Sequence, residues 1–230
     1  TYLLSAALLV SIALHRKGGD VAGKREETRS LSVVAALREG FKVLRENRAL
    51  RGPLGLQTLI FFAAGGFSVL AIVLVREASP PESSLGLSVT GLSVGLGMGV
   101  GSIVANRLPV DLRLRKRIEA VLLFLFVPGT AAIASGGIEL ICLGAFTCGL
   151  AASPLMIRSE SELQRTITSD MRGRIFSFRE ILTRSFFLLS AFLFSALGDY
   201  AGRGLLLFLL GLFLALSGII WVLAQRAGSD

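Results

Sequence analysis

Residues 54–75 read LGLQTLIFFAAGGFSVLAIVLV and contain no charged side chain. A transmembrane helix needs about 20 consecutive apolar residues, so this stretch is long enough to cross the hydrocarbon core of a bilayer. Residues 83–105 and 204–225 are also uncharged and of comparable length. Inside lipid the backbone must pair its own polar groups, and these stretches lack the alternation of a barrel strand. The sequence therefore predicts an all-α integral membrane protein.

The basic residues are distributed unevenly along the chain. Of its 24 Lys and Arg residues, all but Arg76 and Arg203 lie in alternate connections, at the helix ends beside them, or near the C-terminus. An excess of Lys and Arg marks the cytoplasmic loops of membrane proteins. We therefore expect residues 15–52, 107–117 and 158–174 and the C-terminus to be cytoplasmic, with the acidic and Pro-rich residues 77–82 outside.

Six membrane spans follow from this pattern, at about residues 53–75, 85–106, 118–135, 138–157, 174–198 and 204–225. Pro53 suits the first turn of a helix, so we expect the first span to begin there. Residues 1–14 are apolar and read as the end of a preceding membrane helix. Within residues 15–52, residues 31–48 have the spacing of a basic amphipathic helix at the headgroup layer. Residues 226–230 form a cytoplasmic tail.

The composition excludes several functional classes. A net charge of +8 and a pI near 10.5 would suggest nucleic-acid binding in a soluble protein, but the mean hydropathy of +0.70 and the position of the bases beside apolar spans explain the charge without nucleic acid. One histidine and two cysteines give no metal-ligand spacing. Residues 18–25, GGDVAGKR, lack the hydroxyl and the preceding strand of a phosphate-binding loop. We expect no metal, no cofactor and no enzymatic activity.

Polar and small residues inside the spans are the candidates for a functional role. Glu180 and Arg184 are four residues apart, which suits an ion pair on one helix, either as a structural anchor or as part of a gate. Uncharged polar residues either bond between helices or line a cavity, and these are Gln57, Thr58, Ser93, Thr147 and Ser153. Glycines predict close helix packing, with or without sliding, at Gly91, Gly95, Gly97, Gly99 and Gly101.

Two cytoplasmic segments carry a family resemblance. Residues 39–51, EGFKVLRENRALR, resemble the central loop of major facilitator superfamily permeases, most closely the macrolide and siderophore exporters and transmembrane secretion effectors. Residues 163–165, LQR, and 170–177, DMRGRIFS, resemble the loop before helix eleven in that branch. The resemblance implies that residues 1–14 end helix six and that two inverted three-helix repeats follow. It also implies a cytoplasmic gate containing Asp170, Arg172 and Arg174.

The function expected from this resemblance is secondary active transport across a bacterial cytoplasmic membrane. The chain would be the C-terminal half of an exporter of small amphipathic molecules, working by alternating access and coupled to protons. Its partners would be an N-terminal six-helix half, the lipid bilayer and the substrate. The alternative is a self-standing six-helix membrane protein, such as the membrane part of an ATP-driven transporter or a scaffold.

Overall fold

A computed structural model describes residues 40–42, 44–45, 47–79, 85–107, 112–167, 171–198 and 200–227. Contacts divide the chain into two units, 1–35 and 36–230, and every described residue belongs to the second. The predictions for the helix end at residues 1–14, for residues 15–39 of the loop, and for Asp170 lie outside the described residues. Of the predicted amphipathic helix at residues 31–48, the structure describes residues 40–42, 44–45, 47 and 48. Residues 40–42 and 44–45 are helical, but Asn47 is extended and Arg48 already begins the next helix.

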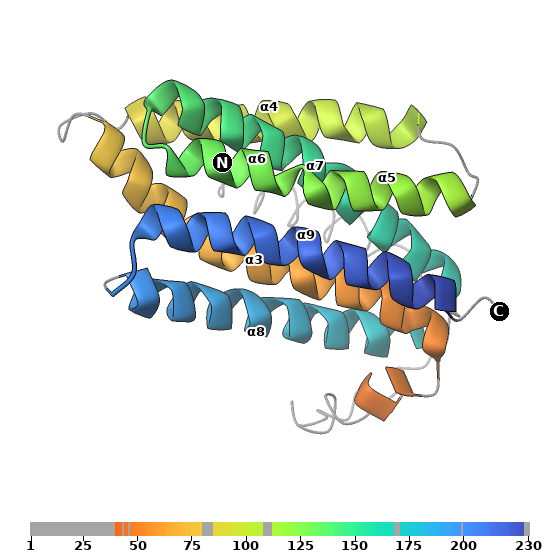
Figure 1. Cartoon of the computed structure of the whole chain (residues 1–230). Coiled ribbons are helices and arrows are strands. Elements are labelled where there is room, and N and C mark those ends of the chain that lie inside the picture. Colours follow the sequence, from red (N-terminus) through yellow and green to blue (C-terminus); the bar gives the residue numbers. More distant parts are fainter. Residues whose placement is uncertain are drawn as a thin grey trace, which may run out of the picture. The chain divides into compact units, whose positions relative to one another are not determined.

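The described residues form helices and contain no β-strand. The long helices are laid side by side, with their ends at the same two edges of the bundle (Figure 1). Their bounds are α3 Arg48–Ala78, α4 Leu85–Arg107, α5 Leu112–Phe124, α6 Phe126–Ala134, α7 Ile138–Thr166, α8 Arg172–Gly198 and α9 Arg203–Ala227. The sequence prediction of an all-helical protein is confirmed.

Five helical segments of this unit are long and apolar enough to cross a membrane. They are Ala49–Ala78, Leu85–Arg107, Arg117–Ala134, Ile138–Thr166 and Arg172–Gly198. These segments correspond to the first five predicted spans and are consistent with a multi-pass membrane protein. In α9 the apolar stretch Arg203–Gly218 is shorter than these five.

Three helices extend at least five residues beyond the predicted spans, namely α3, α7 and α5, which begins at Leu112 inside the predicted loop 107–117. The helix α3 begins at Arg48, so Pro53 lies in its second turn and not in the first turn as predicted. Pro53 lies beyond the first four N–H groups, which lack intrahelical partners in any helix, so the carbonyl of Ala49 loses the hydrogen bond that residue 53 would donate. The helix α7 continues past residue 157 to Thr166, so the first half of the predicted loop 158–174 is helical. This extension holds Glu160 and Gln164.

The third predicted span, residues 118–135, is divided at Leu125 into α5 and α6. Pro128 is the third residue of α6 and has no backbone N–H to donate to the carbonyl of Phe124. Its ring also crowds that carbonyl, which explains why the break lies one residue after Phe124. The signal for this break was present in the sequence as Pro128.

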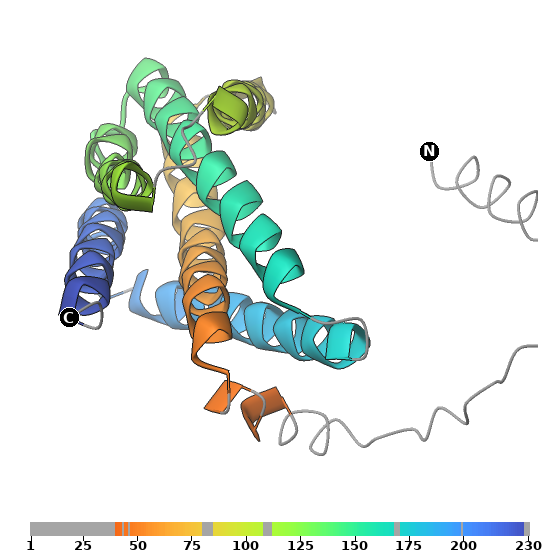
Figure 2. The same cartoon turned by 90° about the vertical axis from the view of Figure 1, so that its right-hand side faces the viewer.

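The helices α3 and α7 occupy the middle of the bundle (Figure 2). The helix α4 packs mainly on α7, α8 packs mainly on α3, and α6 and α9 pack on each other on the opposite side. Leu70, Ile141, Leu155 and Leu207 are almost completely buried in the shared apolar core. The apolar windows of α4 and α8 are each only 17% buried, against 44% for α3 and 50% for α7. Most of the apolar surface of α4 and α8 therefore faces away from this bundle.

The glycines of α4 divide into two groups. A Cβ added to Gly97 would lie 2.9 Å from the carbonyl carbon of Phe146, and one added to Gly101 would lie 2.7 Å from the carbonyl oxygen of Leu150. These two glycines let α4 approach the backbone of α7. A Cβ at Gly91, Gly95 or Gly99 would meet nothing within 4 Å. Close packing within this unit therefore involves Gly97 and Gly101, and the other three face open space because they lie on the opposite side of the helix.

Candidate functional site

A polar cluster lies where α3 begins, α7 ends and α8 begins. Apolar packing fixes these three helix ends, because Leu50 and Leu54 of α3, Leu163 of α7 and Ile175 of α8 form a small buried core there. All three ends belong to the edge of the bundle that carries the basic connections. We call the side chains of Gln57, Glu160, Arg179, Glu180 and Arg184 the polar cluster.

Glu160 is the centre of this cluster. The amide nitrogen of Gln57, a residue only 4% exposed, donates to Glu160 Oε2 over 3.0 Å. The guanidinium of Arg179 forms an ion pair with the same oxygen. The amide nitrogen of Gln164 donates to Glu160 Oε1 over 3.2 Å. One carboxylate therefore links side chains from α3, α7 and α8.

Arg179 connects Glu160 to a second carboxylate. Its Nη2 lies 3.6 Å from Glu180 Oε2, and Arg184 Nε donates to Glu180 Oε1 over 2.8 Å. The Arg179 guanidinium also lies over the ring of Phe176, 4.9 Å from its centroid. The side chain of Arg179 is 20% exposed, whereas those of Glu160 and Glu180 are 34% and 51% exposed. The acids are therefore more accessible than the base between them.

A pocket of about 270 Å³ borders this cluster. Its walls include Gln57, Glu160, Arg179 and Glu180, together with Thr183 and the apolar side chains of Phe61, Met156 and Ile157. The hydroxyl of Thr183 donates to the carbonyls of Arg179 and Glu180, so its bonding is satisfied within α8. We call this space the polar pocket.

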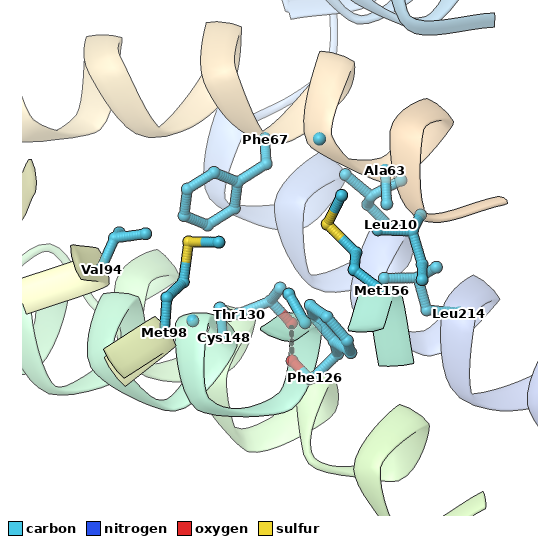
Figure 3. A pocket seen from close by; sticks show the side chains of 14 residues that line it. Ala63, Phe67, Val94, Met98, Phe126, Thr130, Cys148, Met156, Leu210 and Leu214 are labelled. Atoms are coloured by element: carbon cyan, nitrogen blue, oxygen red, sulfur yellow. Dashed lines mark hydrogen bonds between the residues drawn. The ribbon is translucent and has the colours of Figure 1, made fainter. Parts of the chain in front are cut away.

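A second pocket of about 200 Å³ lies inside the bundle, between α3, α4, α6, α7 and α9 (Figure 3). Its walls are apolar and include Phe67, Met98, Phe126, Met156 and Leu210. Thr130 also lines it, and its hydroxyl donates to the carbonyls of Phe126 and Val127; Figure 3 draws the first of these bonds. We call this space the apolar pocket.

Two further interhelical ion pairs lie outside the cluster. Glu119 of α5 and Arg158 of α7 are 4.0 Å apart, with side chains 10% and 13% exposed. At the opposite edge of the bundle, Arg203 pairs with Glu77. Arg203 is one of the two bases outside the basic connections, and this partner offsets its charge.

The described residues of the predicted gate do not all lie in the polar cluster. Glu180 and Arg184 form the predicted i, i+4 ion pair and belong to the polar cluster. Arg172 and Arg174 are exposed in the first turn of α8.

One of the five predicted cavity-lining residues lines a pocket, and four do not. Gln57 lines the polar pocket. The hydroxyls of Thr58, Ser93 and Thr147 each donate to a carbonyl four residues earlier in their own helix. Ser153 is buried, and its Cβ would lie 3.2 Å from a Cβ added at Gly101. These four line neither pocket.

Sequence reasoning missed Glu160, Arg179 and the apolar pocket. Glu160 and Gln164 are four residues apart, a spacing that favours a helical pair, but the segment was interpreted as a loop. Arg179 lies inside the predicted fifth span, where an ionisable side chain by default suggests function. The apolar pocket had no signal, because Met98, Met156 and Phe67 resemble any core residues in sequence.

None of the protein-family models matches this chain, and neither a curated protein nor a solved structure matches it. The functional argument therefore rests on the site and on the bundle that holds it.

Proposed function

We propose that this chain is the C-terminal half of a secondary active transporter, an efflux permease of the major facilitator type. It would export small amphipathic molecules across a bacterial cytoplasmic membrane by alternating access, with protons as the coupling ion. The observation that carries this proposal is the polar cluster. Ionisable residues within a membrane-spanning segment by default suggest a functional site, and Arg179, Glu180 and Arg184 lie within the fifth predicted span.

The pairing of helices supports a pair of inverted three-helix repeats. If α9 completes a sixth span, α3, α4 and α5–α6 correspond to α7, α8 and α9. The contact of α4 with α7 then has its counterpart in the contact of α8 with α3. The contacts of α3 with α7 and of α6 with α9 join equivalent helices. An odd number of spans per repeat makes the second repeat inverted, as in many transporters.

The exposed faces of α4 and α8 support a partner half. These helices flank the central pair α3 and α7 on the same side of the bundle (Figure 2). Each carries large exposed apolar side chains, such as Leu92 and Leu96 on α4 and Leu188 and Phe192 on α8. A second six-helix bundle seated on this side would cover part of both helices and enclose a space lined by α3 and α7.

The polar cluster suits a gate because it joins three helices by contacts that can break and reform. Moving α8 relative to α7 would separate Arg179 from Glu160, and the ends of α3 and α7 would stay linked through Gln57. Each contact is partly exposed, so breaking it costs little, about 1 kcal/mol for each exposed pair. Such a cost suits a two-state transition driven by a ligand or an ion gradient.

Flux measurements test this proposal. Inside-out membrane vesicles that contain the complete protein encoded with this chain should accumulate an amphipathic cation when a pH gradient is imposed. Accumulation should fall when the gradient is collapsed with an ionophore. The absence of flux under every ion gradient would refute transport and would favour a self-standing membrane scaffold.

A further inference from the structure

Two pockets of opposite character meet at one side chain. Met156 of α7 lines both the polar pocket and the apolar pocket. Toward one end of the bundle it borders the space beside Glu160 and Glu180. Toward the middle it faces the cavity that also holds Leu210 and Phe126 (Figure 3). The thioether is flexible and polarisable, so its rotation can join the two spaces without moving the backbone.

The apolar pocket has a mouth and a floor. Ala64 is exposed and Met98 is 39% exposed, so the pocket opens between α3 and α4. Leu210 and Leu214 are each 2% exposed and close the far end at α9. A cavity of about 150 Å³ with Leu, Ile and Phe walls accepts benzene, so a pocket of about 200 Å³ accepts a single aromatic ring.

The charged walls of the polar pocket favour a cation. Two carboxylates, Glu160 and Glu180, and one guanidinium, Arg179, line it. Both acids are more exposed than Arg179, whose guanidinium is covered on one face by Phe176. Arg184, which pairs with Glu180 over 2.8 Å, is 68% exposed and does not line the pocket, so the walls themselves carry two acids and one base. A cationic group entering this space is therefore attracted by the excess acid on the walls.

We propose that the two pockets form one binding site for an amphiphile with an aromatic ring and a cationic head. The ring occupies the apolar pocket behind Phe67 and Met98. The head lies beside Glu160 and Glu180, and the linker passes Met156. This assignment rests on the proposed transport function and names the substrate class of the same site.

Binding of phenylalkylamines to the full chain in lipid nanodiscs tests the site without requiring transport. Phenylbutylammonium, phenylbutyrate and phenylbutanol share one ring and differ in head charge. Calorimetry, with empty nanodiscs subtracted, should show at least tenfold tighter binding of the cation than of either analogue. Within a series of phenylalkylammonium ions, affinity should rise by about fourfold per added methylene until the linker spans the two pockets, and then level off.

Matched substitutions separate the two halves of the site. Ala64→Phe places a ring at the mouth of the apolar pocket and should weaken phenylbutylammonium binding at least tenfold. Ala196→Phe makes the same change at an exposed position of α8 that lines neither pocket, and it should have no effect. Glu180→Gln, at a side chain that is 51% exposed, should remove most of the preference for the cation. Glu139→Gln, at the other end of α7, should retain it.

Equal binding of the three phenylbutyl compounds would overturn the assignment, and so would unchanged cation binding by Ala64→Phe. These outcomes differ from a failure of transport. Flux of another solute without binding of phenylbutylammonium would leave the transport proposal in place and refute this site. Binding that depends on Ala64 and Glu180 without any flux would support the site and refute transport.

Discussion

Alanine substitution at Gly101 and at Gly99 of α4 tests the contact of α4 with α7. In Gly101→Ala, the new Cβ would lie 2.7 Å from the carbonyl oxygen of Leu150, whereas ordinary van der Waals contact begins at 3.4 Å. That obstacle is backbone and cannot rotate away. Pro154 Cδ and Ser153 Cβ, at 3.1 and 3.2 Å, close the other directions. The two helices must therefore separate by about 0.7 Å along this contact, which strains a close-packed interface.

The cost follows from overpacking. Extra methyl groups in tight interfaces destabilise by about 1–3 kcal/mol. Replacing glycine with alanine also gains helix propensity of up to about 1 kcal/mol. In Gly99→Ala the second effect acts alone, because nothing lies within 4 Å of the new Cβ. Since the propensity gain is common to both variants, the difference between them isolates the packing cost and should be about 1–3 kcal/mol.

Reversible unfolding in mixed micelles measures this difference. We expect Gly99→Ala to be neutral or slightly more stable than the parent, and Gly101→Ala to be less stable than Gly99→Ala. Gly97→Ala should be at least as destabilising as Gly101→Ala, because its Cβ would overlap the Phe146 carbonyl oxygen and would also lie 3.0 Å from the Leu150 nitrogen. Equal stability of the Gly99 and Gly101 variants would refute the contact of α4 with α7 described above.

Three further predictions concern the polar cluster, the topology and the helix break. Glu160→Gln removes the negative charge that binds Arg179 and Gln57. Because the carboxylate is partly exposed, the free energy of unfolding should fall by only about 1 kcal/mol, whereas flux should fall at least tenfold. Wild-type flux would contradict a gating role. The orientation can be tested in a chain whose Cys142 and Cys148 are replaced. A membrane-impermeant maleimide should label Ser135→Cys in intact cells but Ser161→Cys only after permeabilisation. Labelling of Ser161→Cys, and not of Ser135→Cys, in intact cells would show that the orientation is the opposite. Pro128→Ala restores a backbone donor for the Phe124 carbonyl. Amide hydrogen exchange at residue 128 should therefore be slow, and the free energy of unfolding should rise by up to about 3 kcal/mol. Fast exchange at residue 128 would mean that the helix break has another cause.

The sequence predicted the helices well, because their signals are local. The uncharged stretch at residues 54–75 depends only on neighbouring residues, and α3 covers that stretch. The ends of the helices were predicted less well. The helix α7 continues to Thr166 because Leu163 and Ile167 pack into the small core with Leu50, a contact between residues far apart in the chain.

The site was harder to predict than the helices. Glu180 and Arg184 could be paired from their spacing alone, since both lie on α8. Glu160 could not be joined to Gln57 or Arg179, because the three come from different helices and the packing of those helices determines which face each presents. The roles of the five glycines at residues 91–101 of α4 could not be predicted for the same reason. Periodicity alone did not reveal that Gly97 and Gly101 face α7 while Gly91, Gly95 and Gly99 face away.

The proposed alternating access requires that the space lined by α3 and α7 open in turn to the two sides of the membrane. The most direct measurement is the labelling rate of Ala64→Cys by an impermeant maleimide, applied from each side in turn to the complete protein without Cys142 and Cys148. Adding phenylbutylammonium and a pH gradient should raise the rate from one side and lower it from the other. The rate at Ala196→Cys should not change. Labelling from one side only, under every condition, would contradict alternating access.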